Sequence, residues 1–194
     1  MLNSQNTQLP APRVPVVDAN GQLMERSWYR FFTNFYNYFV DLPYGSFYDT
    51  TVQTAAANTP TAITFNNAGD TLHTSISVPA SRILFAADGI TTVTFSIQFT
   101  NSSASLDDVY VWLRKNGTDV PYSASAVTVP GKHGSIDGAI VMAVNFHENF
   151  NPGDYLELYW MTVLGTSSIT TIPASVSPAR PASPGVVLTV SQVI

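Results

Sequence analysis

The side chains that could carry chemistry are few in this chain, and they are scattered along it. It holds 13 acidic residues, three histidines and no cysteine among 194 residues. Without cysteine there is no thiolate to bind a metal or act as a nucleophile. His147 and Glu148 begin like the zinc motif His-Glu-x-x-His, but Asn151 stands where the second histidine would be. Since the remaining histidines, His73 and His133, belong to other predicted elements, we expect neither a metal nor a cofactor.

Two further catalytic patterns are incomplete. A phosphate-binding loop would need glycine at Ala126 and a serine or threonine at His133. The Gly-x-Ser-x-Gly motif of serine hydrolases does not occur in the sequence. Several acidic residues could still converge on a calcium ion or form a glycosidase pair: Asp107, Asp108, Asp137, Glu148, Asp154 and Glu157. We expect these acids to be solvated or to form turns, and the protein not to be an enzyme.

The composition excludes several classes of function. Hydrophobic residues make up 45% of the chain, enough to bury a core. Charged residues make up only 11%, against about 25% in an average domain, which suits multi-subunit shells and fibres. The net charge of -5 argues against nucleic acid as a partner. No apolar run is long enough to span a membrane and the start lacks the pattern of a signal peptide, so we expect a protein made in the cytoplasm.

Residues 139–163 contain the clearest pair of strands. In the first, alternate residues are apolar: Ile140, Met142, Val144 and Phe146. The second is apolar on both faces. Its even-numbered residues can fill a core, but Tyr155, Tyr159 and Met161 on the other face also need cover. Because a row of exposed apolar side chains usually marks an interface, we predict that these three residues contact a partner.

Other segments extend the β pattern. Residues 91–100 alternate between an apolar and a hydroxyl-rich face, and Asn116 with Gly117 is typical of a two-residue hairpin turn. Residues 66–70 indicate a turn. Residues 173–185 contain repeated prolines and indicate a surface loop, whereas residues 186–193 indicate a final strand. Regularly spaced short strands favour an all-β sandwich or jelly roll.

Two short motifs resemble a known family. The strand leading into Lys115-Asn116-Gly117, followed later by Gly153-Asp154-Tyr155-Leu156-Glu157-Leu158, resembles the globular heads of complement and tumour-necrosis-factor type. The resemblance implies a jelly-roll sandwich of about ten strands over residues 45–194. It also implies a homotrimer packed about aromatic-rich strands, with Tyr155, Tyr159 and Met161 at the trimer interface of this knob.

A helix is predicted before the knob, over residues 27–42. Aromatic and apolar residues recur there at spacings of three and four, which is the pattern of a helix that packs on other helices. We predict that these residues anchor the protein to a particle or join three helices: Trp28, Phe31, Phe32, Phe35, Phe39 and Leu42. A helix that caps the sandwich core, or one that contacts a membrane, remains an alternative.

The N-terminal arm carries a second resemblance. The segment from Val14 to Leu23, followed by Trp28, Phe31 and Phe32, is similar to the opening of small virion proteins of tailed bacteriophages. There, the segment anchors a module to the particle. The resemblance implies that residues 1–44 form an anchoring arm and helix that docks on another virion protein of the capsid, portal or tail.

Together these resemblances imply a structural protein of the virion, a capsid decoration or head fibre. The alternative is a tail fibre or tail tip whose knob recognises host-surface glycans through loops near Asn101 or Tyr122. An enzyme acting on polysaccharide and a signalling ligand are less favoured, because the sequence shows neither a complete catalytic pattern nor a secretion signal.

Overall fold

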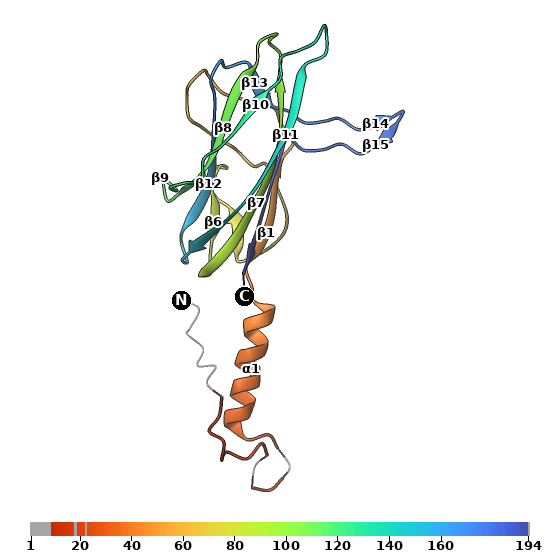
Figure 1. Ribbon diagram of the computed structural model, residues 1–194. Coiled ribbons are helices and arrows are strands. Elements are labelled where there is room, and N and C mark those ends of the chain that lie inside the picture. The colour runs from red at the N-terminus through yellow and green to blue at the C-terminus, as the bar shows by residue number, and fades with distance from the viewer. Residues whose placement is uncertain (1–8, 18, 22, 194) are drawn as a thin grey trace. The chain divides into compact units, whose positions relative to one another are not determined.

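The computed structural model describes residues 9–17, 19–21 and 23–193, without the side chains of residues 37–39 (Figure 1). The chain forms two compact units, residues 1–42 and residues 43–194. Among the described residues, the first unit contains one helix, α1 (Arg26–Val40), and the second, here called the knob, contains the strands. The predicted helix is thus confirmed with ends shifted by one or two residues.

The knob is built from two main sheets. The first has the order β2-β13-β7-β16-β1-β4, and β11 pairs with the other edge of β7. Its strands are β1 (Tyr44–Asp49), β2 (Gln53–Thr54), β4 (Asn67–Leu72), β7 (Gly89–Asn101), β11 (Gly138–Phe150), β13 (Ser167–Ile169) and β16 (Val186–Gln192). The second sheet has the order β10-β8-β12-β6-β5, with β3 beside β12 and β9 beside β8. Its strands are β3 (Thr61–Ala62), β5 (Thr74–Ile76), β6 (Ile83–Phe85), β8 (Asp107–Lys115), β9 (Thr118–Asp119), β10 (Ser125–Val129) and β12 (Tyr155–Thr162).

The apolar residues of alternate positions meet between the sheets. Val93, Phe95, Ile97 and Phe99 of β7 are buried, as the alternation predicts. Leu156, Leu158 and Trp160 of β12 are buried on the opposite sheet. Further aromatic contacts cross the core, including a stack of Phe85 on Phe150 with ring centroids 3.9 Å apart. The inward apolar side chains of the two sheets thus form the hydrophobic core of a β-sandwich.

The two strands of residues 139–163 belong to different sheets. β11 pairs with β7 along its whole length, whereas β12 pairs with β8. The chain therefore crosses from one sheet to the other between residues 150 and 155.

The sequence pattern indicates a turn at residues 66–70, but in the structure the residues from Asn67 onward form the edge strand β4. Asn67 and Ala68 pair with β1 on one side of a register shift, and Thr71 and Leu72 pair with it on the other, so Gly69 and Asp70 lie at a β-bulge within the strand.

The two short motifs of the knob lie against each other. Asn116 and Gly117 have φ angles of 51° and 80°, which confirms the two-residue turn. The side chain of Asn116 donates to Asp154 Oδ1 at 2.7 Å and accepts from the backbone N–H of Tyr155 at 2.9 Å. Lys115 Nζ lies 3.4 Å from Asp154 Oδ2. These contacts join the turn after β8 to the start of β12.

A small hairpin stands apart from the two sheets. β14 (Ser175–Val176) and β15 (Ala179–Arg180) pair only with each other and project sideways from the knob (Figure 1). The sequence pattern predicts a surface loop for this segment, and the structure shows that the loop is a regular hairpin.

Candidate interaction surfaces

The helix of the first unit carries a row of aromatic side chains. Trp28 stacks on Phe32, and Phe31 stacks on Phe35, with ring centroids 5.9 and 6.0 Å apart. Phe32 and Phe35 remain 46% and 48% exposed, while Trp28 and Phe31 are half-buried. Of the other predicted residues in this row, Leu42 is half-buried and the side chain of Phe39 lies outside the described part of the chain. Ring contacts therefore join four of these residues into one continuous aromatic strip: Trp28, Phe31, Phe32 and Phe35.

The arm folds back on the start of this helix. Trp28 Nε1 donates to the Val14 carbonyl oxygen at 3.1 Å, and Val17 forms an antiparallel bridge with Met24. The Glu25 carboxylate accepts from the Ser27 N–H at 2.7 Å and also from the Ser27 hydroxyl. These bonds lower the pKa of Glu25. The arm is thus attached to the first turn of the helix through Trp28. The Glu25 side chain caps the helix, because it accepts from a backbone N–H that has no partner within the helix.

Tyr155, Tyr159 and Met161 lie together on the outward face of β12, and all three are half-buried. The Arg82 guanidinium lies 4.3 Å from the ring centroid of Tyr155, and that of Arg114 lies 4.1 Å from the ring of Tyr159. The sequence predicts their common face. It does not predict these two cation–π contacts, because the arginines come from other parts of the chain.

The arginine over Tyr159 is held by a neighbouring acid. Asp119 Oδ1 accepts from Trp112 Nε1 at 2.9 Å and from Arg114 Nε at 2.8 Å. The bond from Trp112 and the bond from Arg114 lower the pKa of Asp119, and the bond to Asp119 raises the pKa of Arg114. Trp112 also lies 5.9 Å from the Tyr159 ring. The result is a fixed layer of aromatic rings and paired charges.

The buried acid of β12 has a structural explanation. Glu157 is almost fully buried, accepts from the Ser81 hydroxyl at 2.7 Å and lies 3.6 Å from Arg82 Nε. Within the described residues, histidines and acids form no group of three that could hold a metal ion. Of the other acids considered from sequence, Asp108 accepts from the Thr128 hydroxyl at 2.6 Å, and Asp137 is exposed. Glu148 and Asp154 both lie near Lys115 Nζ, at 3.6 and 3.4 Å.

The other sheet presents a face without charged side chains, here called the uncharged face. It consists of the outward residues of β7, β11 and β16, and their paired registers place them side by side. These residues are Ile90, Thr92, Thr94, Ser96, Gln98, Thr100, Ala139, Val141, Ala143, Asn145, His147, Asn149, Val187, Thr189 and Ser191. Depletion of charge is a property of interface cores. The alternation in the sequence indicates that one face of β7 is exposed to solvent. It does not indicate that the uncharged face continues over β11 and β16.

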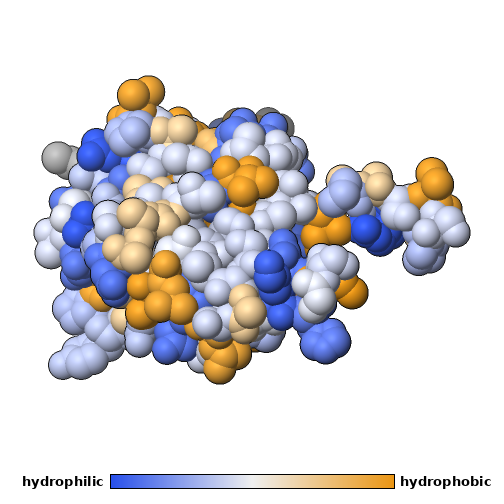
Figure 2. Space-filling view, turned by 90° about the horizontal axis from the view of Figure 1, so that it is seen from above, coloured by the Kyte–Doolittle hydropathy of each residue, from blue (hydrophilic) through white to orange (hydrophobic). Residues whose placement is uncertain are grey.

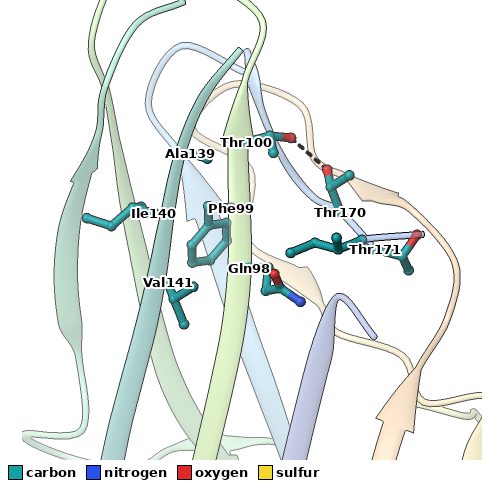
Figure 3. Close-up of a pocket in the computed structure, with 9 residues that line it drawn as sticks. Gln98, Phe99, Thr100, Ala139, Ile140, Val141, Thr170 and Thr171 are labelled. Carbon is teal, nitrogen blue, oxygen red and sulfur yellow. Dashed lines mark hydrogen bonds between the residues drawn. The ribbon is translucent and has the colours of Figure 1, made fainter. Parts of the chain in front are cut away.

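A groove lies at one end of the uncharged face (Figure 3). It has a volume of about 360 Å³ and is lined by β7, β11 and the segment after β13. Ile140 and Val141 lie on its one side and Thr170 and Thr171 on the other, with Gln98 between them (Figure 3). The lining is mainly apolar and carries no formal charge, so it suits a small apolar group rather than an ion.

Comparison with known proteins identifies the fold. No protein-family model and no curated protein matches the chain. Among solved structures, the chain is similar to the structure of Eiger TNF from S. frugiperda, with a TM-score of 0.52 and 9% identity. The match covers 79% of this chain and 94% of the other chain. At that identity it shows the fold alone.

The expected fold class is therefore confirmed: the knob is a TNF-like jelly roll. The resemblance of the arm and helix to phage virion proteins stays a prediction. Among the described residues, no helix is long and apolar enough to cross a membrane.

Proposed function

We propose that this protein is a non-enzymatic, homotrimeric structural protein of a tailed-phage virion, with a jelly-roll knob carried by an anchoring arm and helix. The observation that carries the proposal is the aromatic strip on α1. Phe32 and Phe35 expose almost half of their surface, and burial of that exposed half stabilises an assembly by about 1 kcal/mol each. A strip of this spacing fits a partner helix or a hydrophobic groove.

Two knob surfaces support association of identical copies. The sequence-based prediction uses Tyr155, Tyr159 and Met161, which are half-buried, with arginine side chains over the two tyrosines. The uncharged face is the second candidate. Because each copy has a net charge of -5, copies repel one another, and the repulsion is smallest where no charged side chain faces the partner. Native mass spectrometry at micromolar concentration tests the homotrimer, and a stable monomer would contradict it.

Mutations can show which of the two knob surfaces forms the trimer interface. We expect Ser96→Lys, in the middle of the uncharged face, to dissociate a trimer that uses this face. Tyr159→Ser should instead dissociate a trimer that uses the β12 row. The mass of each variant at one concentration identifies the surface, and a trimer that survives both changes would exclude both.

The anchoring role is supported by the similarity of the arm to virion proteins and by the aromatic strip. We predict that the double change Phe32→Ser with Phe35→Ser lowers incorporation into particles at least tenfold, since it removes about 1.5–3 kcal/mol of apolar burial in the contact. Thr33→Ala, at an exposed position off the strip, is the matched control. Quantitative immunoblots of purified particles measure the effect, and equal incorporation of both variants would contradict the anchoring role.

The location on the particle is tested by electron microscopy with an antibody against residues 45–194. Label over the head supports a capsid decoration or head fibre that docks on a capsid protein. Absence of label from purified particles, with the protein detected elsewhere in the infected cell, would refute the virion proposal.

A tail location is the second candidate, and one observation favours it. Tyr122 is fully exposed on a loop of the knob and has a φ of 62°, so the loop presents an aromatic ring to solvent. Aromatic rings stack on sugars, and the knob would then bind host-surface glycans. Label at the tail, together with slower host adsorption of a Tyr122→Ala phage, would support this role.

A further inference from the structure

The projecting hairpin, residues 172–183, is built as a defined arm. At its base Ile172 and Ser183 exchange two backbone hydrogen bonds of 2.9 and 2.8 Å. Beyond the base, β14 pairs with β15, and Arg180 donates to the Pro173 carbonyl oxygen at 2.9 Å. The hairpin extends away from the body of the knob (Figure 1). Beyond its base, the hairpin pairs with neither main sheet.

The tip of this hairpin is apolar and exposed. Val176 is 96% exposed, and Pro178 and Ala179 beside it are also exposed. The space-filling view shows an apolar group at the end of the projecting arm (Figure 2). Ordering a hairpin costs conformational entropy, and this tip recovers little of that cost by burial in its own chain. Burial against another surface would recover it.

The base of the hairpin is attached to β7. Gln98 Nε2 donates to the Ser183 hydroxyl at 2.8 Å and to the Pro184 carbonyl oxygen at 2.7 Å. On the other side of the base, the hydroxyls of Thr100 and Thr170 lie 2.6 Å apart (Figure 3). Since a preorganised arm loses little freedom on binding, its tip can dock at low entropic cost.

The groove at the end of the uncharged face begins at the same base. Thr170, Thr171 and Ile172 line it, and the hairpin starts from Ile172. The arm therefore leaves from the rim of its own groove, and it extends away from the body of the knob (Figure 1). With about 360 Å³, the groove is at the lower end of the range of about 300–1,000 Å³ for ligand sites. It has room for a few small apolar side chains.

We propose that the hairpin tip, with Val176 at its centre, docks in the groove of a neighbouring copy of this chain. The contact is head-to-tail, so three copies close into a ring in which each gives one tip and receives one. This inference rests on the homotrimer proposed above and adds a specific contact to it. The hairpin belongs neither to the β12 row nor to the uncharged face, so this contact differs from both surfaces considered above.

Charge also favours a second copy as the partner. Residues 172–183 contain one cation, Arg180, and no acidic residue. The rest of the chain has seven basic and 13 acidic residues, so its net charge is 7 − 13 = −6. The hairpin is thus the positive part of a negative molecule, and the attraction between unlike charges guides it toward another copy. The tip and the groove themselves carry no charge that would have to be desolvated.

Disulfide trapping tests the contact directly, because the natural chain has no cysteine. The test variant is Val176→Cys with Val141→Cys, which places one thiol at the tip and one in the groove. The control is Val176→Cys with Val78→Cys, since Val78 is 90% exposed and lies in the loop after β5, away from the groove. After mild oxidation of the full chain, we expect covalent dimers and trimers on a non-reducing gel for the test variant only.

The outcomes separate this inference from the proposed function. A trimer by native mass whose test and control variants cross-link equally would overturn the tip-in-groove contact and leave the trimer intact. A chain that is monomeric by mass would overturn both. Covalent trimer in the test variant well above the control supports both.

A charge at the tip gives a second test. Val176→Asp should raise the dissociation constant of the trimer about tenfold or more, since the buried valine becomes a charged group. Val78→Asp, the matched control, should leave the dissociation constant unchanged, and circular dichroism is used to check that both variants fold. Equal effects of the two changes would also overturn the inference.

Discussion

Asp107 joins the two sheets of the knob, and its removal should be costly. The side chain is buried at the start of β8, and its oxygens accept hydrogen bonds from four residues of the segment 162–167. The donors are the hydroxyl of Thr162, the N–H of Leu164 at 2.9 Å, the N–H and hydroxyl of Thr166 at 3.3 and 3.2 Å, and the N–H of Ser167 at 3.0 Å. This segment leads from β12 in one sheet to β13 in the other. The Asp107 carboxylate therefore fixes the segment that connects the two sheets.

We predict that Asp107→Asn lowers the free energy of unfolding by about 3 kcal/mol. Asparagine has nearly the same shape, but its NH₂ group cannot accept a hydrogen bond and would face backbone N–H donors. Each buried donor left without an acceptor costs about 1–3 kcal/mol. One or two such donors among Leu164, Thr166 and Ser167 account for the expected value.

The effect should depend on pH. Burial tends to raise the pKa of Asp107, but the hydrogen bonds from Thr162, Leu164, Ser167 and Thr166 together hold it below its ordinary value. A carboxyl whose pKa is lowered in the folded state stabilises the fold above its unfolded pKa of about 3.9. That contribution disappears as pH falls through the lower folded pKa. The difference between wild type and Asp107→Asn should therefore be full at pH 7 and should shrink below about pH 4.

Urea unfolding of the full chain at pH 7 and at lower pH, at one protein concentration, measures this difference. The matched control is Asp108→Asn. Asp108 is exposed and bonds to the Thr128 hydroxyl, so its replacement should change stability by no more than about 0.5 kcal/mol. Equal effects of the two substitutions, or a difference that does not change with pH, would refute the reasoning.

Two further predictions concern the frame of the knob. In Gly138→Ala the new Cβ would stand 1.8 Å from the Pro130 carbonyl oxygen, so the backbone must move. We expect a loss of about 2 kcal/mol, or about 4–8 °C in melting temperature by calorimetry, and an unchanged melting temperature would contradict the packing. Asn116→Ala removes the bonds to Asp154 and to the Tyr155 N–H. It should cost about 1–2 kcal/mol in urea unfolding, and no change in the midpoint would show that the turn is not held by its side chain.

Local patterns in the sequence predicted the elements that depend on near neighbours. The alternation in residues 91–100 predicted the buried face of β7, and the aromatic spacing predicted α1. The turn at Asn116 and Gly117 was also predictable, because few residues adopt positive φ at low cost. The sequence predicted that Tyr155, Tyr159 and Met161 share a face, since side chains alternate along any strand.

Only the tertiary structure decided how these elements combine. It separated β11 from β12 into different sheets and made a strand of Asn67–Leu72, because partners distant in sequence provide the hydrogen bonds. It placed Arg82 and Arg114 over the tyrosine row, and joined three strands into the uncharged face. The groove and the projecting hairpin likewise arise where segments far apart in the chain meet. Local propensity carries no information on such pairings, since they depend on the free energy of the whole packed sandwich.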